Sequence, residues 1–238
     1  NQYCQMNINK LSNTAPNKIN YILPFILFAN LMPIYGVLNF GWTLFSVLYI
    51  YWLELLIITF FDFLKIVSAN GDDSTNWMKL VLGGKLILIR VGIFFFYLTF
   101  LITFIGIMLS AKNEDVKDLV TMADALFLKS TFYKITLLSV FISHTIDFYF
   151  SFIASNKYKN TTAQKEFIFL DAHILVVHIV IVLSVFLYKG LTEKMNIEHT
   201  SAIVACVSLF AIIKIVVDYA KAVTNNKDLP NKPTDIFI

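Results

Sequence analysis

Three side chains that can bind protons or metal ions stand within long apolar stretches of this sequence. They are Glu54, His144 and His178, and a charged group at such a position costs roughly 2.5–3.5 kcal/mol to place at the centre of a bilayer. Two imidazoles and a carboxylate from separate segments are a recurring ligand set for zinc, iron or manganese. The combination predicts a transition-metal site, with Asp147 and Asp171 as further oxygen ligands.

Other roles are open for the same side chains. His144 and His178 could ligate a b-type haem from neighbouring helices, although this leaves Glu54 unexplained. Polar groups within a membrane also stabilise helix–helix contacts, at about 0.6–2 kcal/mol each, and chains of histidines and carboxylates can relay protons. A single residue of this kind is most often structural. Three at one depth favour a functional site.

Three further charged residues have a simpler interpretation. Lys214 and Asp218 are four residues apart, which places them on one face of a helix and predicts an ion pair; we assign it a structural role. Arg90 is expected near the end of a span, where its long side chain can reach the interface. Gly83-Gly84-Lys85 lacks the spacing of a phosphate-binding loop.

The composition predicts a membrane protein. Of 238 residues, 58% are apolar and only 15% are charged, and the mean hydropathy is +0.70, so much of the apolar surface must face lipid. The net charge of +3 is too small to indicate nucleic-acid binding. Two cysteines, Cys4 and Cys206, cannot form a disulfide framework or a cysteine-based metal site.

Six apolar segments have the length of about 20 residues that a membrane-spanning helix needs. They predict an all-α, polytopic helix bundle over residues 20–223, between an N-terminal tail (1–19) and a C-terminal tail (224–238). Residues 113–128 predict an amphipathic helix that lies in the membrane interface. The segments are Asn20–Phe40, Thr43–Lys65, Leu86–Ser110, Thr131–Ala154, Phe167–Tyr188 and Thr200–Val223.

The distribution of lysine and arginine predicts how the bundle is oriented. Basic residues near the span ends are more numerous on the side that holds both termini, which favours cytoplasmic termini in a prokaryotic cell membrane. With this topology, Glu54, His144 and His178 fall within about one helical turn of the midplane. Asp147 and Asp171 extend the polar column toward the cytoplasm.

Several motifs follow one another in the order seen in a known family. The first spans carry Asn30-Leu31-Met32-Pro33-Ile34-Tyr35-Gly36-Val37, Gly41-Trp42 and Tyr51-Trp52-Leu53-Glu54, and later spans carry Ser143-His144, His178 and Lys214-x-x-x-Asp218. Together they resemble an uncharacterised prokaryotic membrane family, a DUF6498-like domain of unknown function. The sequence departs from the family pattern at Thr145-Ile146-Asp147-Phe148. The resemblance implies a shared fold and shared positions, and no activity.

We therefore expect a bundle of about six membrane helices with a buried site of Glu54, His144 and His178, supported by Asp147 and Asp171. The leading hypothesis is a metal-binding protein with a redox or catalytic function. The second is a non-catalytic accessory or assembly subunit of a larger membrane complex, and the third is a proton or ion transporter. The expected partners are the lipid bilayer, other membrane subunits or further copies of the chain, and no nucleic acid.

Overall fold

The computed structural model describes residues 18–71, 74–103, 124–170 and 172–227. Within them, six helices are long and apolar enough to cross a membrane, so the prediction of an all-α membrane bundle is confirmed. Most of the amphipathic helix predicted over residues 113–128 lies outside the described residues, as does most of both tails.

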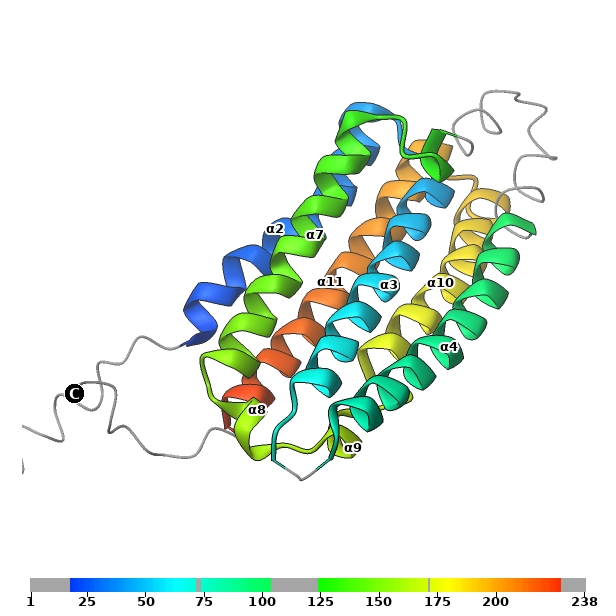
Figure 1. The fold of residues 1–238 in the computed structure, drawn as a ribbon. Helices are drawn as coiled ribbons and strands as arrows, with labels where there is room; N and C mark the ends of the chain where they lie inside the picture. The colour runs from blue at the N-terminus through cyan, green and yellow to red at the C-terminus, as the bar shows by residue number, and fades with distance from the viewer. Residues whose placement is uncertain (1–17, 72–73, 104–123, 171, 228–238) are drawn as a thin grey trace, which may run out of the picture.

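Six long helices form the bundle in the described part of the chain. The six are α2 (Lys18–Phe40), α3 (Leu44–Ser68), α4 (Asn76–Phe100), α7 (Thr131–Phe148), α10 (Ala172–Lys189) and α11 (His199–Lys227). A π-helical turn continues α7 as η3 (Tyr149–Ile153), and another continues α10 as η4 (Gly190–Lys194). The short helices α8 (Lys157–Asn160) and α9 (Ala163–Glu166) lead from η3 toward α10 (Figure 1).

Hydroxyl side chains define where three of the long helices begin. Thr43, Thr75 and Ser130 precede α3, α4 and α7, and each accepts a hydrogen bond from a backbone N–H in the first turn. The first backbone N–H groups of a helix have no carbonyl acceptor within the helix, and the capping hydroxyl serves as the acceptor for one of them. Between α2 and α3 the chain reverses at Gly41, whose φ of +61° lies in the left-handed region that glycine adopts without steric cost.

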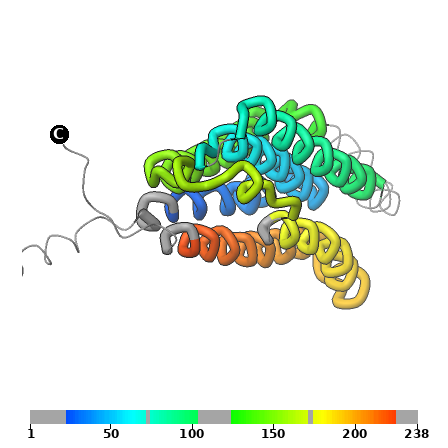
Figure 2. Tube along the Cα trace, turned by 60° about the horizontal axis from the view of Figure 1, so that its bottom comes forward, coloured from blue at the N-terminus to red at the C-terminus, as the bar shows by residue number. Residues whose placement is uncertain are grey.

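Helices that are distant in sequence pack side by side. Contacts join α2 to α7 and α11, and join α3 to the same two helices, so these four surround a common interior (Figure 1). Helix α4 packs on α3, and α10 packs on α11. Figure 2 shows α10 and α11 together on one face of the bundle, with α3 and α4 on the opposite face.

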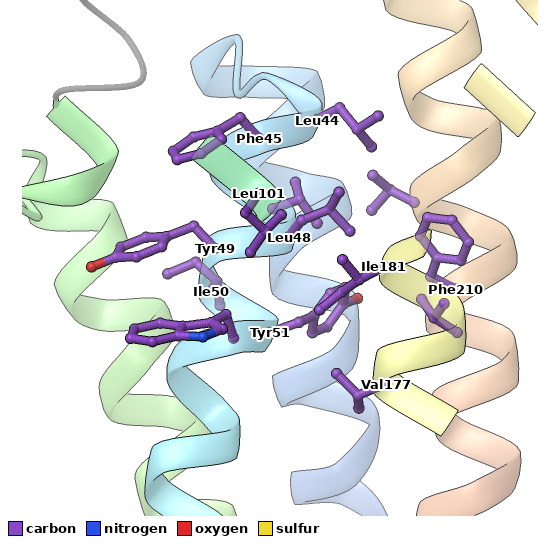
Figure 3. Packing of buried hydrophobic residues seen from close by; sticks show 14 of the residues in the cluster. Leu44, Phe45, Leu48, Tyr49, Ile50, Tyr51, Leu101, Val177, Ile181 and Phe210 are labelled. Carbon is purple, nitrogen blue, oxygen red and sulfur yellow. The ribbon is translucent and has the colours of Figure 1, made fainter. Parts of the chain in front are cut away.

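The main apolar core fills the part of the bundle nearest the turn between α2 and α3. Leu48 and Ile50 of α3 pack there with Ile181 of α10 and Phe210 of α11 (Figure 3). By contrast, α4 presents large apolar side chains outward, including Phe96 with 71% of its surface exposed. This exterior suits lipid, because the hydrocarbon core of a bilayer is itself apolar.

Candidate functional site

A cluster of charged side chains lies between α2, α3, α7 and α11. Glu54 Oε1 on α3 accepts hydrogen bonds from His144 Nε2 of α7 at 2.9 Å and from Lys214 Nζ of α11 at 2.8 Å. Lys214 Nζ also donates to Asp218 Oδ2 at 3.0 Å. Asn30 Nδ2 of α2 donates to that same oxygen at 3.0 Å. Each of the four helices therefore contributes to one network.

The network lies deep inside the protein. Glu54 is 2% exposed and Lys214 is 6% exposed, whereas the His144 side chain keeps 20% of its surface exposed. An ionised Glu54 requires the facing His144 Nε2 to carry a proton, because a carboxylate only accepts hydrogen bonds. Leaving one member of a buried ion pair without its partner costs about 3–5 kcal/mol. The cluster thus fixes the relative positions of its helices.

A small cavity adjoins this cluster, and a larger cavity adjoins the small one. The smaller, of about 40 Å³, is lined by Glu54 and His144 together with Asp147, Asp218 and Lys221, and it is large enough for water. The larger, of about 500 Å³, lies toward the end of the bundle where α11 ends, and its lining includes side chains from α3, η3, α9, α10 and α11. Asp147 and Lys221 line both cavities, so polar side chains continue from one to the other.

The wall of the larger cavity contains a π-helical turn. Ser151 and Phe152 of η3 line the cavity, and Ser151 Oγ donates a hydrogen bond to Asp147 Oδ1 at 2.6 Å. A π-helical turn widens the helix by one residue and is frequent at functional sites. It therefore brings the hydroxyl of η3 against the carboxylate at the junction of the cavities.

Arg90 supports the opposite wall of that cavity. Its guanidinium donates to Asp62 Oδ2 at 2.7 Å, to the Ile168 carbonyl at 2.6 Å and to the Phe169 carbonyl at 3.4 Å. Residues 167–170 are not helical, and non-helical backbone at membrane depth requires such partners. The prediction that Arg90 reaches the interface is wrong: the residue is 1% exposed, because it satisfies these carbonyls.

His178 has a separate environment. Its Nδ1 donates to the backbone carbonyl of Ile174, and its ring packs edge-to-face on Tyr97 with centroids 3.9 Å apart, near Phe94. His178 Nε2 is buried without a hydrogen-bond partner among the described residues. The side chain does not line the cavity beside Glu54. Its surroundings are those of a packed core residue on α10.

The structure therefore brings together only part of the predicted ligand set. Glu54 and His144 are in contact, and Asp147 lines the same small cavity, while Asp171 lies outside the described residues. Within the described ranges, no group of three or more histidine, cysteine, aspartate or glutamate side chains could hold a metal ion. The Lys214 ammonium supplies beside Glu54 the positive charge that we expected from a metal.

Three members of the network, Asn30, Lys214 and Asp218, were not assigned to the site from the sequence. Lys214 was paired with Asp218 alone, although a lysine inside an apolar span is itself a signal of a buried anion nearby. Asn30 is the first residue of the motif that resembles the family, but an asparagine at this position does not by itself predict a contact with α11. Only the packing of α2 against α11 places it beside Asp218.

Comparison with known proteins gives one result on family and none on activity. The family model of DUF6498, described as a family of unknown function, matches residues 13–235, which include every described helix. No curated protein and no solved structure matches the chain.

Proposed function

Because this chain belongs to DUF6498, a family of unknown function, we infer its role from the site, and we propose that it moves protons across a membrane. The observation that carries the proposal is the double contact of Glu54 Oε1, which accepts from His144 at 2.9 Å and from Lys214 at 2.8 Å. A buried carboxylate held by an imidazole and an ammonium can exchange a proton with the imidazole, the only one of the three groups whose ordinary pKa is near neutrality.

The charge balance around the small cavity supports this role. Its lining includes three carboxylates (Glu54, Asp147 and Asp218), two lysines (Lys214 and Lys221) and the imidazole of His144. With a neutral imidazole the sum of these charges is one negative, and with one added proton it is zero. Since uncompensated charge is costly at membrane depth, this set of side chains favours the uptake of one proton from water.

A path for that proton leads from the end of the bundle that holds α8 and α9. The larger cavity reaches Asp147, which also lines the small cavity beside His144, and side chains of this kind relay protons in membrane proteins. Beyond Glu54, the core around Leu48 and Phe210 is apolar. We therefore propose that the described conformation exposes the site to one side, and that a second conformation exposes it to the other.

The side that is exposed follows from the basic residues near the span ends. They are more numerous on the side of the termini, which by the positive-inside rule is cytoplasmic. We propose that protons enter the cavity from the cytoplasm. Fusing a reporter domain to the C-terminus and testing its access to membrane-impermeant reagents in intact cells checks this orientation; labelling from outside the cell contradicts it.

The proposal is tested by proton flux into liposomes that contain the purified protein. A potassium gradient with valinomycin sets the membrane potential, and an enclosed pH dye reports proton entry. We expect Glu54→Gln and His144→Gln to lower the rate by about tenfold or more, as removal of a relay group does. Glu198→Gln and His199→Gln are matched controls, because both residues are exposed and neither lines the cavity beside Glu54.

Two results of the flux measurement would overturn the proposal. The first is a wild-type rate no faster than that of protein-free liposomes, and the second is a wild-type rate in Glu54→Gln. The metal hypothesis and the accessory-subunit role both stay predictions. Elemental analysis of the same preparations tests the metal hypothesis. A stoichiometric metal that is lost in Glu54→Gln and His178→Ala would replace proton movement as the function of the site.

A further inference from the structure

The larger cavity has the size of a binding site for a small molecule. Its volume of about 500 Å³ falls within the range of about 300–1,000 Å³ that is typical of ligand pockets. One part of its lining is apolar and includes Phe152, Val176 and Val217. Another part is charged. This combination of an apolar wall with a few polar groups is characteristic of sites for small organic molecules.

Two interruptions of regular helix border the cavity. One is η3, which contributes Ser151 and Phe152, and the other is the non-helical stretch 167–170, which contributes Ile168. Binding sites of membrane carriers are typically formed where helices are broken, because irregular backbone there can face a ligand. The Arg90 guanidinium holds the carbonyls of Ile168 and Phe169, so this break is a built part of the fold.

The lining carries charges of both signs. Three lysines (Lys65, Lys157 and Lys221) stand with three carboxylates (Asp62, Asp147 and Glu166). Lys65 lies 2.9 Å from Asp62, which the Arg90 guanidinium also contacts at 2.7 Å, and Lys157 lies 3.6 Å from Glu166. A ligand that carries both signs finds an opposite charge for each of its ends in such a lining.

Asp147 and Lys221 are placed to meet the two ends of such a ligand. Both line the inner part of the cavity, where it adjoins the small cavity. Among the described residues, the Asp147 carboxylate accepts one hydrogen bond, from Ser151 Oγ at 2.6 Å, and a carboxylate has acceptor sites for about three more. An ammonium group can therefore bind Asp147 while an acidic group binds the lysine side.

We propose that the larger cavity binds a small zwitterion with a primary ammonium and an acidic group, of the size of an amino acid. Its ammonium contacts Asp147, its acidic group contacts Lys221, and its apolar part packs on Phe152 and Val217. Two sources share this chemistry: a free amino acid and the headgroup of phosphatidylethanolamine. The binding does not depend on proton movement through Glu54, so the two proposals can fail separately.

The test is calorimetric titration of the purified full chain in detergent. The standard amino acids are the probes, and leucine is compared with 4-methylpentanoate, which lacks the ammonium, and with isoamylamine, which lacks the carboxylate. We expect saturable binding of at least one amino acid at one site per chain. For leucine we expect each analogue to bind about tenfold or more weakly, because each leaves one charged partner unpaired.

Matched variants assign the two ends of the ligand. Asp147→Asn should weaken the amino acid and the amine by about tenfold or more and leave the acid unchanged, and Lys221→Gln should have the converse effect. Lys159→Gln is the control, since Lys159 is exposed and does not line the cavity. Val217→Phe should weaken the binding of leucine by about tenfold or more, because the added ring occupies the part of the cavity where the apolar side chain of the ligand packs. Thermal melting of each variant identifies any that has failed to fold.

Native mass spectrometry distinguishes the two sources of the ligand. One phosphatidylethanolamine that stays with the protein and is lost in Asp147→Asn supports the same chemistry, with a lipid headgroup as its source. Binding of 4-methylpentanoate as tight as that of leucine overturns the proposal in favour of an anion site. Absence of saturable binding by every amino acid, together with absence of a retained lipid, overturns it altogether.

Discussion

Polar side chains are arranged differently in the two halves of the bundle. In the turn half, which lies between Glu54 and the α2–α3 turn, polar groups form small local contacts. Tyr133 Oη donates to Ser46 Oγ at 3.0 Å, Ser46 Oγ lies 3.1 Å from Thr43 Oγ1, and Trp52 Nε1 donates to the Phe94 carbonyl at 2.8 Å. In the terminus half, which extends from Glu54 to the end of α11, the polar groups form a network across four helices and line both cavities.

Polar side chains in the two halves therefore differ in role: those of the turn half stabilise helix packing, and those of the terminus half can also exchange protons. Local contacts of this kind satisfy individual donors and stabilise helix packing, and they form no continuous path through the core of Figure 3. The network in the terminus half has cavities beside it and includes several groups that can exchange protons. Tyr51 marks the boundary, because it precedes Glu54 by three residues on α3 and its hydroxyl is buried without a hydrogen-bond partner among the described residues.

The largest expected effect comes from removing the cation at the centre of the network. Lys214→Met leaves Glu54 and Asp218 without the ammonium that both contact, so we expect the free energy of unfolding to fall by about 3–5 kcal/mol. Unfolding in mixed micelles, followed by circular dichroism, measures the change. Lys159→Met, on the exposed connector, is the control and should be within about 0.5 kcal/mol of wild type.

A double variant shows whether the loss comes from the charge. In Lys214→Met with Glu54→Gln one buried carboxylate no longer needs a partner, and we expect part of the stability to return. If the double variant is destabilised by the sum of the two single changes, the contact between Glu54 and Lys214 contributes no coupling, and the terminus half would resemble the turn half.

A smaller effect is expected at the wall of the larger cavity. Arg90→Met removes the donor to two carbonyls and to Asp62. Since an unsatisfied buried acceptor costs about 1–3 kcal/mol, we expect a loss of about 2–3 kcal/mol and faster amide hydrogen exchange in residues 167–170. Arg90→Lys keeps the charge but lacks the planar set of donors, so its loss of stability should be smaller than that of Arg90→Met and larger than zero. Unchanged exchange in Arg90→Met would mean that these residues are held by other contacts.

The sequence predicted the six spans because length and hydropathy alone decide whether a helix can cross a bilayer. Boundaries were less accurate. The third span was expected from Leu86, but α4 begins at Asn76, since the cap at Thr75 and the contact of Lys79 Nζ with Asn70 Oδ1 at 3.3 Å extend the helix through polar residues. The fifth span was expected from Phe167, but α10 begins at Ala172.

For the site, sequence spacing succeeded within a helix and failed between helices. The i,i+4 spacing predicted a contact of Lys214 with Asp218, and the structure has it at 3.0 Å. Depth along each helix suggested that Glu54, His144 and His178 could meet, but depth does not specify which way a side chain faces. His144 faces α3, whereas His178 faces Tyr97, because the rotation of α10 is set by tertiary packing.

The smallest effect on stability, and the most direct test of the comparison, comes from accessibility. In a background of Cys4→Ser and Cys206→Ala, Ser151→Cys places a thiol in the larger cavity, and Ser46→Cys places one in the apolar core, where Ser46 is fully buried. Each exchange is small and should cost less than about 1 kcal/mol. A charged methanethiosulfonate reagent added on the terminus side should modify Ser151→Cys and spare Ser46→Cys, as mass spectrometry would record. Equal modification of both would show that water reaches the two halves alike, and the turn half could then no longer serve as the closed side of a proton path.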